Sequence, residues 1–184
     1  MFCYIAFLRG INLGKRRVKM EQLRGLFEAM KFTAVETFIA SGNVLFTAKS
    51  ADAGMLGRRI EVHLEKSLGY AVDTFVRSRA EVAAIAAARP FAAADFNHPG
   101  HTIHVGFLRE KLTPEQTLKL SKCHTDVDEF RVIGREYYWL CRIKTNESKV
   151  WTLPQLREIR MPSSSMRNLT TLRKLAALAP PTRD

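Results

Sequence analysis

The sequence has few cysteines, only three among 184 residues, and they lie far apart. An odd and scattered set does not form a disulfide framework, so we expect free thiols at Cys3, Cys123 and Cys141. No apolar run is long enough to cross a bilayer. Residues 1–8 carry neither the basic segment nor the small-residue cleavage site of a secretory signal. These absences predict a cytoplasmic protein with no membrane partner.

Signatures of known chemistry are also scarce. The stretch from Gly10 to Lys15 is not a Walker A loop, because only three residues separate its glycines and an arginine follows its lysine. Three histidines recur every third residue: His98, His101 and His104. A Pro-Gly pair interrupts them and no Cys or carboxylate cluster adjoins them, so we expect no metal site. No nucleophile–base or paired-carboxylate pattern is present. The sequence predicts no cofactor, and it leaves open whether the protein is an enzyme.

Acidic residues are fewer than basic residues, and the imbalance is concentrated in two segments of the chain. The formal net charge is +11. Residues 1–31 hold seven Lys and Arg against two Asp and Glu, and residues 142–174 hold eight against two, whereas residues 32–141 hold thirteen of each. Charge gathered in two segments indicates one basic face if folding brings the segments together. Phosphate-bearing ligands and nucleic acid are the expected partners, and the oligomeric state is left open.

Hydrophobic periodicity in the first half predicts the order βαββαβ, which is the ferredoxin-like arrangement. Gly69 supplies a helix stop. We expect strands over residues 1–8, 35–39, 44–47 and 71–76, and helices over residues 19–30 and 56–68.

The second half predicts a similar order. A loop over residues 94–101 separates it from the first half, which gives domains at 1–92 and 93–184. The expected fold class is α+β, with two ferredoxin-like halves that have antiparallel sheets and are closely packed or intertwined, the second ending in helices. We expect a helix over residues 81–88 before this loop. After it we expect strands over residues 103–108, 129–133 and 137–143, and helices over residues 114–120, 153–159 and 166–178.

Two short echoes support an internal repeat. Residues 6–9, Ala-Phe-Leu-Arg, return at residues 106–109 as Gly-Phe-Leu-Arg. Residues 35–38, Val-Glu-Thr-Phe, return at residues 127–130 as Val-Asp-Glu-Phe. The matching order of elements is the stronger argument for the repeat.

The segment after the first strand is the main candidate site. Two glycines, one amide and five cationic side chains lie between a strand and a helix, where exposed backbone N–H groups and positive charge can meet an anion. The alternative is that the glycines only provide positive φ for the turn. The candidate anion-binding residues in this loop are Arg9, Gly10, Asn12, Gly14, Lys15 and Lys19.

Two further segments are candidates for the same site. Ser41 and Asn43 flank a glycine in a hairpin turn, and they either only form the turn or line the site. Arg167 and Asn168 stand at the expected start of the last helix, after three serines that are N-cap candidates. They act there either as capping residues or as an anion site at the helix N-terminus. We expect residues 10–19 and 167–174 to share one face and one anion.

These observations predict a basic cytoplasmic protein that binds an anion, a nucleotide or nucleic acid through the glycine-rich strand–helix loop. An enzyme that acts on a phosphorylated small molecule is the alternative. A basic face that meets an acidic protein is a third hypothesis.

Four short motifs stand out along the chain: Leu-Arg-Gly-Ile-Asn at 8–12, Val-Lys-Met at 18–20, Ser-Gly-Asn at 41–43 and Arg-Asn at 167–168. In these motifs the chain resembles the bacterial domain of unknown function 1697, and the resemblance covers nearly its whole length. The resemblance implies an α+β fold with two ferredoxin-like subdomains and no established activity, so it supplies no catalytic residue. It also covers Ser148-Lys149, which adds Lys149 to the residues that line the candidate site. The departures from the family pattern are Lys15, Ala40 and Leu169.

Overall fold

The computed structural model describes residues 1–14, 16–39 and 42–178. The chain divides into two compact units. Unit 1 comprises Met1–Ala86 together with the segment from Arg173, and unit 2 comprises Ala87–Leu172. None of the helices formed by the described residues has both the length and the apolar composition that a bilayer crossing requires.

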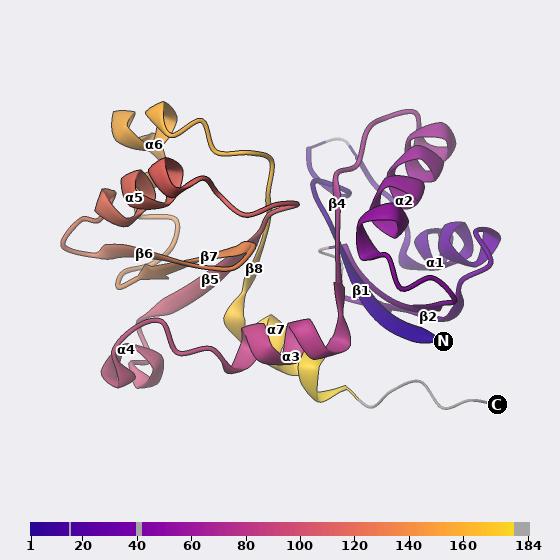
Figure 1. The fold of residues 1–184 in the computed structure, drawn as a ribbon, viewed down its shortest axis with the longest axis horizontal. Coiled ribbons are helices and arrows are strands. Elements are labelled where there is room, and N and C mark those ends of the chain that lie inside the picture. The colour runs from indigo at the N-terminus through magenta and orange to yellow at the C-terminus, as the bar shows by residue number, and fades with distance from the viewer. Residues whose placement is uncertain (15, 40–41, 179–184) are drawn as a thin grey trace. The chain divides into compact units, whose positions relative to one another are not determined.

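Unit 1 contains a four-stranded antiparallel sheet with strand order β2-β3-β1-β4. Helices α1 and α2 cover one face of this sheet (Figure 1). The chain order and the strand order are those of a ferredoxin-like fold, as the sequence predicts. The elements are β1 (Phe2–Leu8), α1 (Met20–Ala29), β2 (Thr33–Phe38), β3 (Asn43–Ala48), α2 (Ala53–Leu68), β4 (Thr74–Ser78) and α3 (Arg79–Ala87).

The local sequence explains these elements. The central strands β1 and β3 are apolar along nearly their whole length, and all their residues from Tyr4 to Leu8 and from Asn43 to Ala48 are buried. Asp52 caps α2, where its carboxylate accepts the N–H of Met55 at 2.8 Å. Gly69 ends the helix with φ +78°. Arg79 on α3 donates to the carbonyl of Leu178, which fixes the end of the described chain to unit 1.

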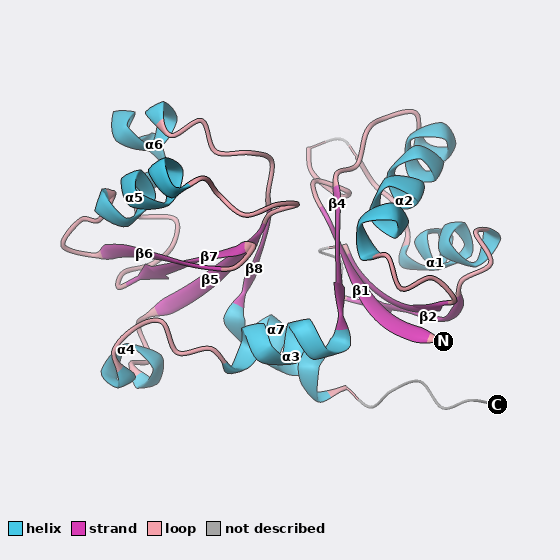
Figure 2. Ribbon diagram, viewed as in Figure 1, coloured by secondary structure: helices cyan, strands magenta, loops and turns pink. Residues whose placement is uncertain are grey.

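Unit 2 repeats the topology, with an antiparallel sheet of strand order β6-β7-β5-β8 (Figure 2). Thr113 and Gln116 form a capping box at the start of α5. The elements are α4 (Ala93–Asn97), β5 (Thr102–Phe107), α5 (Pro114–Lys122), β6 (Asp128–Ile133), β7 (Glu136–Cys141), the 3₁₀ helix η1 (Val150–Thr152), α6 (Pro154–Glu158) and β8 (Ser165–Asn168). Helix α7 (Leu169–Ala177) begins in unit 2, and its residues from Arg173 belong to unit 1.

The core of unit 2 is built around Trp139. Its ring stacks on His104, with 4.9 Å between ring centroids. Its indole N–H donates to the buried carboxylate of Asp128 at 2.8 Å. Ser148 and Thr125 donate their hydroxyls to the same carboxylate at 2.9 and 3.0 Å. Ser148, which the family resemblance singles out, therefore has a structural role in this unit.

The first sequence echo marks equivalent positions in the two sheets. The Leu8 N–H donates to the carbonyl of Gly42 at 2.8 Å, and the Leu108 N–H donates to the carbonyl of Arg135 at 2.9 Å. Each leucine therefore leaves its strand beside the turn of the neighbouring hairpin. The internal repeat inferred from the order of elements is confirmed at the level of topology.

Two buried arginines also occupy equivalent places. Arg77 on β4 lies opposite Ile5, and Arg167 on β8 lies opposite Val105. Each guanidinium donates to the carbonyl of the preceding residue, at 3.0 and 2.8 Å respectively. Burial lowers the pKa of Arg167 to about 10.

Two expectations about elements were wrong. The last helix begins at Leu169, not at residue 166, because residues 165–168 pair with β5 as strand β8. The segment over residues 94–101, expected to be a loop throughout, contains most of the short helix α4. Asp95 on α4 pairs with Arg142, with 3.1 Å between Oδ1 and Nε.

Candidate anion-binding site

The candidate loop lies at the end of unit 1 where β1 ends and α1 begins. Both of its glycines have positive φ, +68° at Gly10 and +60° at Gly14, as the turn hypothesis requires. Ile11 is buried between them, while Leu13 is exposed. The loop is therefore fixed to the core at Ile11 and extends into solvent beyond it.

Asn12 closes the base of the loop. Its side-chain oxygen accepts the N–H of Val18 at 2.7 Å, and its side-chain nitrogen lies 3.4 Å from the carbonyl oxygen of the same residue. Val18 is buried, so the Asn12 side chain links the start of the loop to a residue at its end that is fixed in the core. The Asn12 side chain is thus a structural clamp, and its predicted ligand contact stays a prediction.

Tyr70, just after α2, supports the loop from one side. Its hydroxyl donates to the carbonyl of Ile11 at 3.3 Å. The guanidinium carbon of Arg16 lies 4.2 Å from the centroid of its ring, within the range of a cation–π contact. This contact orients Arg16 while leaving it exposed to solvent.

Arg9, Arg17 and Lys19 are also exposed. Arg9 pairs with Asp73 at 3.4 Å, and both side chains remain partly in solvent. Arg17 donates to the carbonyls of Gly14 and Arg16 at 2.9 and 2.8 Å. Lys19 occupies the N-cap position of α1 without a side-chain capping bond. Lys15 lies outside the described residues.

The hairpin turn between β2 and β3 packs against this loop. Gly42 has φ +76°, and a Cβ atom added there would lie 2.7 Å from Cγ2 of Ile11 and 3.1 Å from Cβ of Leu8. The structure therefore brings the turn and the loop together. Asn43 is fully buried and donates to the carbonyl of Phe38 at 3.0 Å, which holds the hairpin closed. Ser41 lies outside the described residues.

The other predicted site residues belong to unit 2. Arg167 is buried in β8, where its guanidinium donates to the hydroxyl of Ser165 at 2.9 Å. The expectation that Arg167 stands at a helix N-terminus was wrong, because the strand continues through Asn168. Asn168 accepts the N–H of Thr170 at 2.7 Å, as a capping residue does. Lys149 is exposed before η1. The anion site shared between both segments stays a prediction.

Two residues that contact the candidate loop, Tyr70 and Asp73, were not predicted from the sequence. Both lie between α2 and β4, about sixty positions after the loop that they contact. The available signal was topological. In a ferredoxin-like fold the second helix runs parallel to β1, because it follows β3, which is antiparallel to β1. The glycine at its C-terminus therefore marks a segment at the end of the sheet where β1 ends and the loop begins.

Comparison with known proteins identifies the family. A family model described as a protein of unknown function (DUF1697) matches residues 1–138. The chain belongs to this family. The matched region includes all of the candidate loop, the hairpin turn and the segment that carries Tyr70.

A solved structure extends the likeness beyond the region matched by the DUF1697 model. A conserved bacterial protein from Streptococcus pneumoniae superposes with a TM-score of 0.72 at 20% sequence identity, over 96% of this chain and 97% of that chain. At this identity the likeness shows the fold alone. No curated protein matches the chain. The biochemical function is therefore argued from the site.

Proposed function

We propose that this DUF1697 protein binds a polyanion, with nucleic acid as the leading candidate, through the strand–helix loop of unit 1. The observation that carries the proposal is the set of exposed cations on a loop that is fixed at both ends. Arg16, Arg17 and Lys19 are all exposed, and among the loop's neighbours Asp73 pairs with Arg9. Residues 9–19 hold five Lys and Arg and no Asp or Glu, and such a concentration of positive charge favours phosphate binding.

The fixed backbone supports the proposal energetically. Asn12 closes the loop and Tyr70 supports it, so the backbone at Ile11 and Val18, the two ends of the loop, needs little ordering when a ligand binds. Less ordering leaves more of the interaction energy as affinity. Three free cysteines suit a reducing compartment, and we place the protein in the cytoplasm as part of this proposal. The alternative of an enzyme that acts on a phosphorylated small molecule stays a prediction.

The test is the salt dependence of binding to a fluorescein-labelled mixed-sequence DNA duplex, followed by fluorescence anisotropy from about 50 to 200 mM salt. Lys19→Gln removes one exposed cation at a position with no side-chain capping bond, so the fold should be unaffected. If Lys19 contacts a phosphate, the slope of log K against log salt should fall in magnitude by about 0.9.

Lys66→Gln is the matched control. Lys66 is exposed in the last turn of α2 in the same unit, and its substitution changes the net charge equally. We expect Lys66→Gln to retain the parent slope. Equal slopes for the parent and Lys19→Gln, or equal losses in both variants, would show that the loop does not direct binding.

A further inference from the structure

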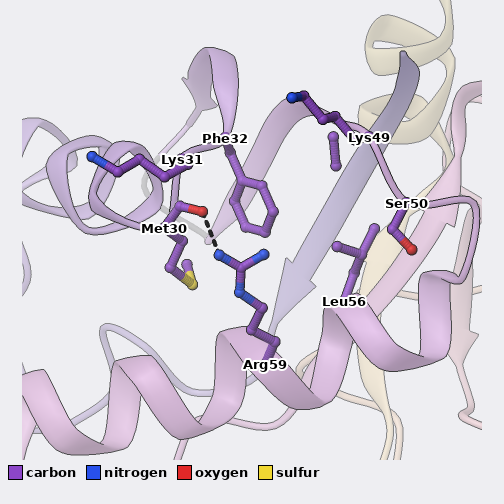
Figure 3. A pocket seen from close by; sticks show the side chains of 8 residues that line it. Met30, Lys31, Phe32, Lys49, Ser50, Leu56 and Arg59 are labelled. Atoms are coloured by element: carbon purple, nitrogen blue, oxygen red, sulfur yellow. Dashed lines mark hydrogen bonds between the residues drawn. The ribbon is translucent and has the colours of Figure 1, made fainter.

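A second site lies at the opposite end of the unit 1 sheet from the candidate loop. There α1 ends, β2 begins, β3 ends and α2 begins. The segments between these elements enclose a pocket of about 290 Å³. Figure 3 shows that its walls come from α2, from the segment between α1 and β2, and from the residues after β3. The lining residues are Met30, Lys31, Phe32, Ala48, Lys49, Ser50, Leu56 and Arg59.

The floor of the pocket is apolar. Met30, Phe32 and Leu56 are buried core residues that contribute side chains to it, and Ala48 leaves space at the end of β3. The hydroxyl oxygen of Ser50 already accepts the N–H of Asp52 at 3.1 Å. An apolar floor of this kind favours a ligand with an apolar body.

The rim of the pocket is cationic. Lys31, Lys49 and Arg59 are all exposed, and no carboxylate among the described residues forms an ion pair with any of them. Arg59 is held in place, because it donates to the carbonyl of Met30 at 2.5 Å and its guanidinium carbon lies 5.2 Å from the ring centroid of Phe32. In Figure 3 this guanidinium lies between the α2 backbone and Phe32. A fixed cation above an apolar floor fits a ligand with both characters.

We propose that this pocket binds a small phosphate monoester whose body is a single apolar ring. The volume corresponds to about ten waters and lies at the lower end of ligand pockets, which limits the body to about one ring. Three cations at the rim favour a phosphate monoester, whose charge near neutral pH is about −1.5 to −2. The proposal does not depend on the polyanion site, because no residue is common to the two.

The test is titration of the isotope-labelled full chain with phenyl phosphate, followed by NMR amide shifts. Saturable shifts should appear at Lys31, Phe32, Lys49 and Ser50. Inorganic phosphate lacks the ring and benzyl alcohol lacks the charge, so both should bind at least about ten-fold more weakly. Equal binding of inorganic phosphate, or shifts confined to the residues of the strand–helix loop, would overturn the proposal.

Two substitutions test the rim without harming the fold. Lys31 has φ +64°, so Lys31→Gly removes a cation at a position that glycine prefers. Lys49→Gln removes a second, exposed cation. Together they should weaken phenyl phosphate binding about two- to thirty-fold, since each exposed charge pair contributes a modest part of the affinity. Lys66→Gln and Lys19→Gln should leave this binding unchanged. Parent affinity in the double variant would refute the assignment.

Discussion

The contact between the hairpin turn and the strand–helix loop predicts an unusual sensitivity at Gly42. Its φ of +76° is one that L-residues with a side chain rarely adopt, and an added methyl group would lie 2.7 Å from Cγ2 of Ile11. Gly69 provides a matched comparison, because its φ is +78° and a Cβ there would meet no atom within 4 Å. Alanine at Gly42 should therefore cost both strain and overpacking, whereas alanine at Gly69 should cost strain only.

The magnitudes follow from these two contributions. Left-handed backbone costs an alanine about 1–2 kcal/mol, which is the full expectation for Gly69→Ala. Overpacking against Ile11 and Leu8 adds about 1–3 kcal/mol at Gly42. We expect Gly42→Ala to reduce the free energy of unfolding by about 2–5 kcal/mol in total. The difference between the two variants measures the contact itself.

Urea titration followed by far-ultraviolet circular dichroism gives the free energies, and amide hydrogen exchange localises them. The exchange of β1 and β3 amides is the decisive readout, because both tryptophans, Trp139 and Trp151, belong to unit 2. If Gly42→Ala and Gly69→Ala cost the same within about 0.5 kcal/mol, the turn does not press on the loop and the reasoning fails.

Three further predictions concern unit 2. Gly106→Ala should lower the free energy of unfolding by about 3 kcal/mol or more, because its Cβ would lie 2.0 Å from the ring of Tyr137. Adding Tyr137→Leu to this variant should restore part of the lost stability, as measured by urea titration. Burial lowers the pKa of His104 below its usual 6.5. Its contribution to the free energy of unfolding should therefore be present above about pH 6.5 and decrease as the pH falls. In His104→Gln the free energy of unfolding should change less between pH 7.5 and 5 than it does in the parent protein. Asp128→Ala should cost about 1–3 kcal/mol by leaving the Trp139 N–H without its acceptor, and Asp128→Asn should cost less, as tryptophan fluorescence during unfolding will show.

Much of the fold could be predicted because its elements have strong local signals. The helical spacing in α1, the glycine stop after α2 and the Thr-Pro start of α5 each indicate a boundary without tertiary information. Strand β8 gave no such signal. Its two buried residues are Ser165 and Arg167, so its buried face is polar and hydropathy does not reveal it.

The two repeated sequence segments also show what the sequence alone does not predict, which is the register of the strands. Phe7 and Phe107 occupy equivalent positions, opposite Asn43 and Glu136. The second echo fails, because Phe38 also lies opposite Asn43, and the residue opposite Glu136 in β6 is Ile133, not Phe130. Short identities do not encode strand register, which the pairing of distant strands decides.

The sequence predicted only those features of the candidate site that come from one continuous segment, residues 9–19. The positive φ of Gly10 and the exposed cations follow from the loop's own composition, whereas Tyr70 reaches it through the topology. The pocket beside Arg59 was missed entirely, because it is assembled from three separate segments and each appears unremarkable alone.

The Asn12–Val18 clamp has a consequence for how this protein can vary. Since the clamp closes the loop beneath the exposed residues Leu13, Gly14, Arg16 and Arg17, this outer part of the loop should contribute little to folding, apart from the contact of Arg16 with Tyr70. Its length and charge should therefore tolerate change while the rest of unit 1 stays folded. It is accordingly a position where a foreign peptide can be grafted for display.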